Sequence, residues 1–403
     1  SIGRPVIRGM DGDHIQILQN GLSNLDVSNL SADHGVSIDP LIIEQIELIR
    51  GPSSLLYGNG ISGGIINAID HRIPKDVLNG ITGRGESRYD TADHGQSNAA
   101  VVDIGSGSFV IHMDAYNRNT GNLMIPDYAV SQIKNSNDSS HGKGSLINSD
   151  SNTYGGAIGA SIIFDRGYAG LSYSNHNTNY GSPAEDTVRL KMDANLWNFA
   201  SEIKDIDYFF NRIKIRLSNT DYQHSEIDSG IIQTTFKNTG TEGSFEMGLK
   251  PLKSLESIIG FSFSDSQLKS IGSESFAPDS KTTSQSYYFL EQLPFDKNKL
   301  IFGLRLASHQ IDSTSNNKNF FTNNLSLGYE NNFRDNWLFK TNLNHLERAP
   351  TYYELFANGV HSATGQYVLG SNQLNNETSN GIEFNLNYKN EKDLSLIHIS
   401  EPT

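Results

Sequence analysis

The stretch NKLIFGLRLASHQ, residues 298–310, alternates apolar and polar side chains along most of its length. In an extended strand, successive side chains point to opposite faces. Leu300 and Phe302 therefore fall on one face, and Gly303 and Arg305 fall on the other. This period of two predicts a β-strand with one apolar and one polar face, and it excludes an amphipathic helix for this stretch.

The same alternation returns in NWLFKTNLNH (336–345) and GIEFNLNYKN (381–390), and in about fourteen segments between residues 80 and 392. Short turns alternate with longer polar loops between these segments, as in an up-and-down antiparallel sheet. In a transmembrane β-barrel the apolar face contacts lipid and the polar face lines an aqueous lumen, so no long hydrophobic runs are expected. The short connections are 164–167, 250–253, 294–298 and 331–336, and the longer ones are 120–151, 178–186, 311–318 and 347–378.

A soluble β-sandwich or propeller would also alternate, but two features favour the barrel. The segments run to about ten to fifteen residues, whereas sandwich strands usually have about five or six. Aromatic residues also gather at the segment ends, as in the aromatic girdles of membrane barrels. They are Tyr180, Tyr208, Phe209, Tyr222, Tyr287, Tyr288, Phe320, Phe321 and Tyr388.

Composition narrows the possible functions of this 403-residue chain. Hydrophobic residues make up 36%, and no stretch approaches the roughly eighteen apolar residues of a membrane helix. There is no cysteine, which excludes both disulfides and thiolate metal sites in this sequence. The net charge of −14 argues against a nucleic-acid partner, because phosphate binding needs concentrated Lys and Arg. The same charge is compatible with the capture of cations.

Residues 1–73 have a different pattern, with short β runs, Gly-rich turns and a short helix expected around SSLLYG (53–58). We predict a small mixed α/β domain here. The run GNGISGG (58–64) could suggest a phosphate-binding loop, but it lacks the lysine that such a loop requires.

Two stretches of this domain, GRPVIRGMDGDHIQILQNG (3–21) and IEQIELIRGPSSLLYGNGISGGIINAID (43–70), resemble the plug domain of TonB-dependent outer-membrane receptors. The resemblance implies a plug inside a twenty-two-stranded barrel in the outer membrane of a Gram-negative bacterium. It also implies nutrient import driven by the TonB complex of the inner membrane, and plug charges at Glu47 and Arg50 that pair with the barrel wall. We expect a monomeric barrel surrounded by outer-membrane lipid.

On this basis we expect the chain to cover only part of such a receptor. Residues 1–73 would be the C-terminal part of the plug, and residues 74–393 would be about fourteen of the barrel strands. An open sheet with unpaired edges is not stable in lipid, so the chain alone should not insert. Residues 394–403 break the alternation, and we predict that they are not native.

Within the family, SADHGVSIDPLIIEQIELIRGP (31–52) resembles the zinc-uptake receptors, as do NTNYGSP (177–183), FKNTGTEGSFEM (236–247) and residues 347–383. The resemblance implies that Asp33 and His34 of the plug bind the transported zinc together with His361 of a barrel loop. Carboxylate and neutral imidazole are suitable zinc ligands, and zinc usually takes four. The fourth ligand is expected to be a barrel carboxylate, with Glu291 as one candidate. The loop after NYGSP departs from the subgroup, because it lacks a His-rich insertion.

The alternatives are a haem receptor, which could use the same loop histidine, and a receptor for a siderophore or another chelate. Haem would need apolar or aromatic walls, and Tyr352, Tyr353, Phe356 and Tyr367 are available nearby. An enzyme is not expected, since the chain has no G-x-S-x-G elbow and no H-E-x-x-H motif, and no catalytic cofactor is expected. An adhesin would have no use for a plug, and an open channel without ligand binding would favour a porin.

Overall fold

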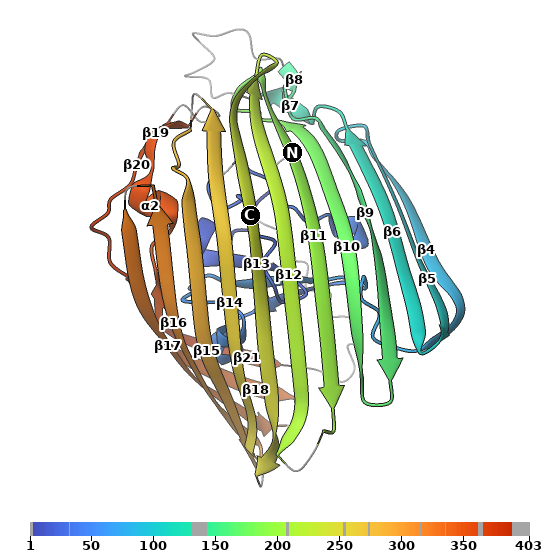
Figure 1. The fold of residues 1–403 in the computed structure, drawn as a ribbon, viewed down its shortest axis with the longest axis vertical. Coiled ribbons are helices and arrows are strands. Elements are labelled where there is room, and N and C mark those ends of the chain that lie inside the picture. The colour runs from blue at the N-terminus through green and yellow to red at the C-terminus, as the bar shows by residue number, and fades with distance from the viewer. Residues whose placement is uncertain are drawn as a thin grey trace.

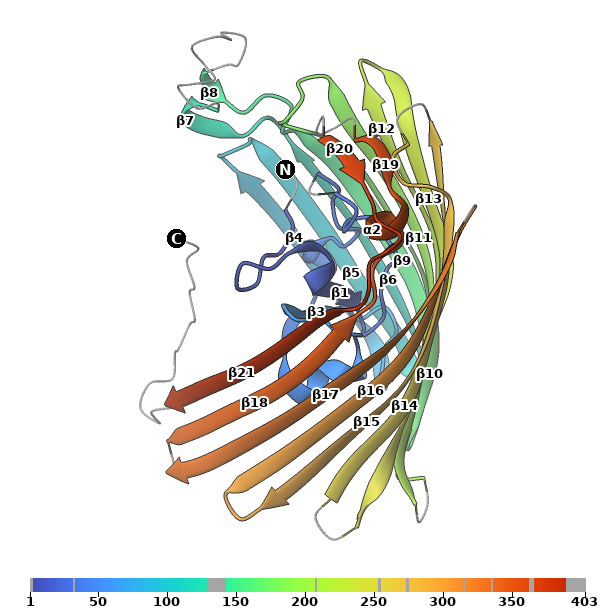
Figure 2. The same cartoon turned by 90° about the vertical axis from the view of Figure 1, so that its left-hand side faces the viewer.

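The computed structural model describes residues 3–31, 33–129, 143–206, 209–252, 255–272, 275–314, 316–334, 336–361 and 366–388. A 14-stranded antiparallel sheet dominates it and curves around a small N-terminal domain (Figures 1 and 2). Residues 394–403 lie outside the described part, so the prediction made for them stays a prediction. Within the described part, no helix is both long enough and apolar enough to cross a membrane.

The large sheet follows the chain order with two interruptions: β6 pairs with β9, and β18 pairs with β21. Its order is β21-β18-β17-β16-β15-β14-β13-β12-β11-β10-β9-β6-β5-β4. The strands are β4 Leu78–Asp90, β5 Gly95–Gly107, β6 Phe109–Thr120, β9 Ser151–Phe164, β10 Gly167–Gly181, β11 Val188–Lys204, β12 Phe210–Asp228, β13 Ile231–Leu252, β14 Leu255–Gly272, β15 Ser280–Phe295, β16 Asn298–Ser313, β17 Asn317–Arg334, β18 Trp337–Arg348 and β21 Glu377–Tyr388.

The alternation of the sequence becomes an apolar outer face and a polar inner face. On β16, Phe302 is exposed on the outside, whereas Arg305 is buried on the inside. On β21, Ile382 and Phe384 are also exposed on the outer face. An apolar outer band around a polar interior is the arrangement of a membrane barrel, so the fold prediction is confirmed.

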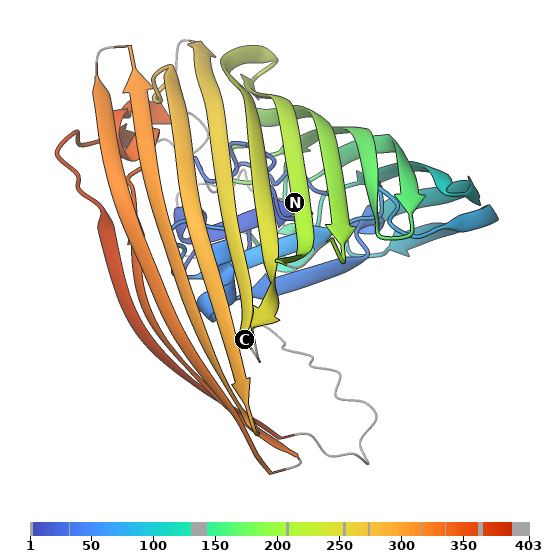
Figure 3. The same cartoon turned by 60° about the horizontal axis from the view of Figure 1, so that its bottom comes forward.

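The sheet is open, with β4 and β21 at its edges (Figure 3). The fourteen strands that we predicted are present, and they form part of a barrel of the expected kind. One predicted loop is wrong: most of 311–318 is strand, because β16 continues to Ser313 and β17 begins at Asn317. The neighbouring β16 and β17 remain in register along this extension, which the polar sequence did not reveal.

The N-terminal domain lies against the concave face of the sheet (Figure 2). It contains a three-stranded sheet in the order β1-β3-β2. The helix expected around SSLLYG is a 3-10 helix rather than an α-helix. In chain order the elements are η1 Gly12–His14, β1 Ile15–Gln19, η2 Pro40–Ile42, β2 Gln45–Ile49, η3 Gly51–Leu56 and β3 Gly64–Ile69.

Close backbone contact seats this domain in the sheet. Gly60 has a φ of +65°, and a Cβ there would lie 2.0 Å from the backbone oxygen of Glu347. Only glycine fits such a position. Arg305 of β16 donates to the backbone oxygen of Leu55 in η3 at 3.0 Å.

The ion pairs between the plug and the barrel differ from those expected. Arg8 pairs with Glu383 at 2.5 Å, and Arg72 pairs with Asp114 at 2.9 Å. In the described residues, Glu47 and Arg50 form no ion pair within 4.0 Å. Glu47 instead accepts a hydrogen bond from Asn67. Asn67 lies opposite Glu47 on β3, within the plug.

The long connections cluster at one end of the sheet. They carry β7 Met124–Tyr128 and β8 Lys143–Ser145, and also α2 Tyr352–Phe356, β19 Asn358–His361 and β20 Gln366–Leu369. The segment with α2, β19 and β20 folds inward over the plug (Figures 1 and 2). This inward segment positions one side of the site described next.

Candidate metal centre

The plug contributes Asp33 and His34, which lie in a loop between β1 and η2. The His34 ring is fixed by a hydrogen bond of 3.0 Å between its Nδ1 and the backbone oxygen of Val27. If Nδ1 donates to that carbonyl, Nε2 is directed at the other side of the site. Ser31 Oγ donates to Asp33 Oδ1 and orients that carboxylate.

The barrel contributes Glu226 from the end of β12 that adjoins the long loops. Tyr222, His224 and Glu226 alternate along this strand, so their side chains share its inner face. All three are buried. Glu226 accepts a hydrogen bond from His34 Nε2 at 3.0 Å, and thereby links barrel to plug.

The inward segment contributes His361 at the end of β19. Helix α2 begins with a capping box, in which the Thr351 side chain and Glu354 bond each other's backbone N–H groups. The β19–β20 hairpin then pairs Asn358 with Leu369 and brings His361 to the plug. The His361 ring packs against Phe276, with ring centroids 4.8 Å apart.

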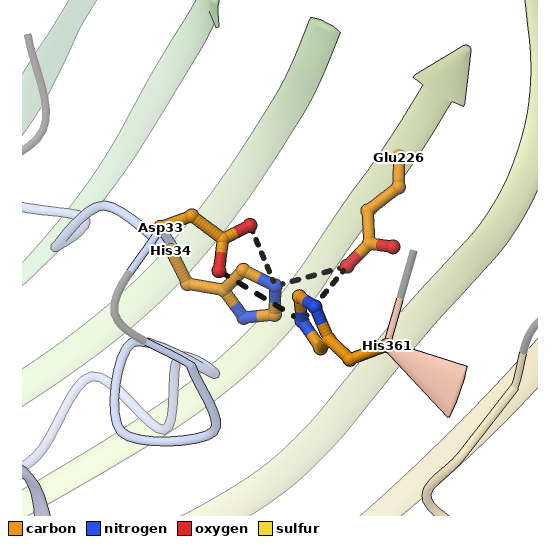
Figure 4. A group of neighbouring side chains, drawn as sticks. All are labelled: Asp33, His34, Glu226 and His361. Atoms are coloured by element: carbon orange, nitrogen blue, oxygen red, sulfur yellow. Dashed lines mark hydrogen bonds and ion pairs between the residues drawn. The ribbon is translucent and has the colours of Figure 1, made fainter. Parts of the chain in front are cut away.

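One potential ligand atom from each of Asp33, His34, Glu226 and His361 lies within 4.8 Å of the others (Figure 4). His361 Nε2 is 3.7 Å from Glu226 Oε1 and 3.8 Å from Asp33 Oδ1, and His34 Nε2 is 4.0 Å from Asp33 Oδ2. His34 is 0% exposed and His361 2%. Two carboxylates are thus enclosed beside two imidazoles, which is costly unless positive charge compensates them.

The environment affects the two histidines in opposite directions. Burial by itself would lower the pKa of His34, but its hydrogen bond to Glu226 and the charges of Asp33 and Glu226 outweigh burial, so the pKa is raised. For His361, burial dominates over the attraction of Glu226 and Asp33, and the pKa is lowered. Without a metal, the site therefore favours a proton on His34 and a neutral His361.

Apolar and aromatic side chains surround this group. The ring centroid of His34 lies 4.3 Å from that of His224 and 5.7 Å from that of Phe236. His224 Nδ1 is hydrogen-bonded to Tyr222, and its Nε2 has no hydrogen-bond partner among the described residues. The buried apolar residues of this region are Val27, Leu30, Tyr180, Leu190, Met192, Ala194, Leu196, Tyr222, Phe236, Leu268, Phe276, Ala277 and Ala357. They keep bulk water away and strengthen electrostatic interactions inside.

The structure brings together the three site residues Asp33, His34 and His361. Glu291 is not among them: it lies on β15, where it accepts a hydrogen bond from Ser257 at 2.7 Å. The carboxylate in the group is Glu226, which sequence reasoning missed. Its signal was the row Tyr222, His224 and Glu226 in DYQHSEID (221–228), but many barrel strands show polar residues at this spacing.

A plugged antiparallel membrane barrel with a buried group of metal-ligand type is the class that these observations define. The chain belongs to the TonB-dependent receptor family: residues 78–397 match the TonB dependent receptor-like β-barrel, and residues 1–65 match the TonB-dependent receptor plug domain.

Solved structures of similar fold include metal transporters and a siderophore receptor. The copper transporter OprC has 15% sequence identity and a TM-score of 0.80, over 97% of this chain. The FrpB iron transporter from Neisseria meningitidis (F3-3 variant) has 12% identity and a TM-score of 0.75, over 95% of this chain and 63% of its own. The siderophore receptor PirA from Pseudomonas aeruginosa has 18% identity and a TM-score of 0.68, over 96% of this chain and 66% of its own. The chain spans 64% of the length of OprC.

Proposed function

We propose that this protein is a TonB-dependent receptor of the Gram-negative outer membrane that captures zinc ions and imports them with energy from the TonB complex. Residues 1–73 serve as plug and residues 74–393 as barrel wall. The observation that carries the proposal is the buried group of Asp33, His34, Glu226 and His361, whose ligand atoms lie within 4.8 Å of one another. The activity is transport, and no catalytic step is involved.

The ligand chemistry suits zinc and disfavours copper(I). Two imidazoles and two carboxylates form a four-ligand set of the kind that zinc accepts in a tetrahedral arrangement. The set contains no thiolate or thioether, which copper(I) prefers. The two carboxylates together neutralise the double charge of the ion, so the enclosed site becomes electrically balanced on binding.

A haem or siderophore receptor is the second candidate, and the buried histidine His361 is what favours it. The packing argues against it, because His34, Glu226 and His361 are each at most 2% exposed and the rings of Phe236 and Phe276 lie against the two histidines. A macrocycle or chelate would require this packing to open. A single ion needs only the ligand atoms that already lie within 4.8 Å of one another.

The test is metal analysis of the full-length protein, purified in detergent after loading with zinc. We expect about one zinc per chain, and its loss in an Asp33→Ala/His34→Ala double variant. Glu226→Gln should weaken zinc binding at least about tenfold, because one of the charged ligands is removed. Glu291→Gln is the matched control and should bind zinc like the unaltered protein. Equal zinc in the double variant and the unaltered protein would refute this site.

A further inference from the structure

The NYGSP motif places Tyr180 near the end of β10, and its phenol points at the plug loop that carries Asp33 and His34. Tyr180 is buried, and its ring belongs to the apolar residues around the metal centre. Its hydroxyl accepts a hydrogen bond from the backbone N–H of Gly35 at 2.8 Å. The same hydroxyl donates to the backbone oxygen of Asp33 at 3.2 Å. One phenol thus bonds the backbone on both sides of His34.

We propose that Tyr180 is a positioning residue for the metal centre: it fixes the backbone of plug residues 33–35 against the barrel, so that Asp33 and His34 meet Glu226 and His361. This inference rests on the proposed function. A phenolic hydroxyl can donate one hydrogen bond and can also accept one. The Tyr180 hydroxyl does both with the plug backbone.

The need for such a residue follows from where the ligands come from. Asp33 and His34 belong to a plug loop, whereas Glu226 belongs to β12. A metal site requires its ligands to be placed within a fraction of an ångström, and loops do this less precisely than strands. Tyr180 couples the loop to β10, which pairs with β11, and β11 pairs with β12. The loop thereby shares a rigid frame with Glu226.

Close packing supports the same role. A Cβ at Gly35 would lie 3.4 Å from the Tyr180 hydroxyl, so the backbone of Gly35 rests directly on the phenol. The loop is also held from within the plug, where Asp26 accepts hydrogen bonds from the backbone N–H and the hydroxyl of Ser37. Among these contacts, those of Tyr180 are the ones that tie the loop to the barrel.

The test compares Tyr180→Phe with Tyr116→Phe in the full-length protein. Tyr180→Phe keeps the ring and removes only the hydroxyl. Tyr116 is a matched control, because its buried hydroxyl bonds His176 at 2.7 Å, and both residues belong to the barrel wall. Zinc affinity is measured by competition with a chelator, and backbone hydrogen exchange is measured at residues 33–35.

We expect Tyr180→Phe to bind one zinc per chain at saturation, with a dissociation constant raised about tenfold. That factor corresponds to about 1.4 kcal/mol. Without zinc, the Gly35 amide should exchange faster in Tyr180→Phe than in the unaltered protein, and zinc should restore its protection. Tyr116→Phe should change neither quantity.

Three results would count against the inference. If the Asp33→Ala/His34→Ala variant loses zinc but Tyr180→Phe binds it as tightly as the unaltered protein, the positioning role is refuted and the metal centre stands. If the double variant retains its zinc, the metal centre itself is refuted, and the positioning role with it. A Tyr180→Phe protein that is merely less heat-stable, with unchanged zinc affinity, would also refute the positioning role.

Discussion

At the scale of single residues, His34 is the residue on which the metal centre depends most. Its Nδ1 is bonded to the Val27 carbonyl, and its Nε2 is bonded to Glu226. A histidine that bonds acceptors through both nitrogens is protonated, in agreement with its raised pKa. An incoming metal ion would replace the Nε2 proton, while the bond to Val27 keeps the ring in place.

Zinc binding should therefore depend on pH through a single proton. Below the pKa of His34 a proton competes with the ion, so the affinity should fall about tenfold for each unit of decreasing pH. Above that pKa the affinity should become constant. His361 takes up its proton at lower pH than His34, because burial lowers the pKa of His361. The measurement is the zinc dissociation constant between about pH 5 and pH 8.

The logarithm of that dissociation constant should fall with increasing pH on the acid side, with a slope of about one in magnitude. A slope of two would mean that both histidines are protonated without metal. A flat line would show that His34 is not a ligand.

At the scale of elements, the inward segment between β18 and β21 is held at its base by Arg348. Its guanidinium donates two hydrogen bonds of 2.9 Å to Glu354 in α2 and two, of 2.7 and 3.0 Å, to Glu377 in β21. A forked pair of this kind is among the stronger polar interactions in proteins. Tyr353 of α2 also donates to Asp13 of the plug. The segment that carries His361 is thus fastened to both the barrel and the plug.

Replacing Arg348 by methionine should loosen this segment and so weaken the hold of His361 on zinc. We expect zinc to dissociate about three to ten times faster, since the charge-assisted bonds are lost and two carboxylates are left facing each other. Limited proteolysis should cut more readily within residues 349–376. Lys340→Met is the control, because Lys340 pairs with Glu330 on the adjoining strands, apart from this segment. Equal dissociation rates in both variants would contradict the role of Arg348.

At the scale of the whole molecule, a buried charge pair joins the plug to the barrel. Arg72 follows β3 and bonds Asp114 of β6 through two nitrogens, at 2.9 and 3.3 Å. Asp114 is also bonded to His112, and Arg72 lies near Asp70. Buried pairs of this type contribute little net stability, but replacing one partner leaves the charge of the other buried and uncompensated.

Arg72→Ala should therefore destabilise the seating of the plug by about 3 kcal/mol, since Asp114 would remain enclosed without its guanidinium partner. Hydrogen exchange of residues 64–70 in detergent measures the free energy of local opening. Arg189→Ala is the control: Arg189 pairs with Asp150 at 2.7 Å, but both are partly exposed, so the loss should stay below about 1 kcal/mol. Comparable losses in the two variants would show that the buried pair does not anchor the plug.

The sequence by itself determined the strands, their order and their faces. An alternation such as that of residues 298–310 depends only on the two-residue period of a strand, which is a local property, and short turns force neighbouring strands to pair. The plug residues Asp33 and His34 were indicated mainly by family resemblance, with support from their loop context and ligand chemistry. His361 followed only from family resemblance.

Only the tertiary structure decided which carboxylate joins Asp33, His34 and His361. Glu226 lies 192 residues from its partner His34 along the chain, and β12 has no local feature that distinguishes it from β15, which carries Glu291. The choice depends on the rotation of the plug within the barrel and on the inward fold of residues 349–376. Both are set by many long-range contacts, among them Tyr180 with Gly35 and Arg72 with Asp114. A pattern of period two contains no information on such contacts, because it specifies the face of a strand and not what lies opposite.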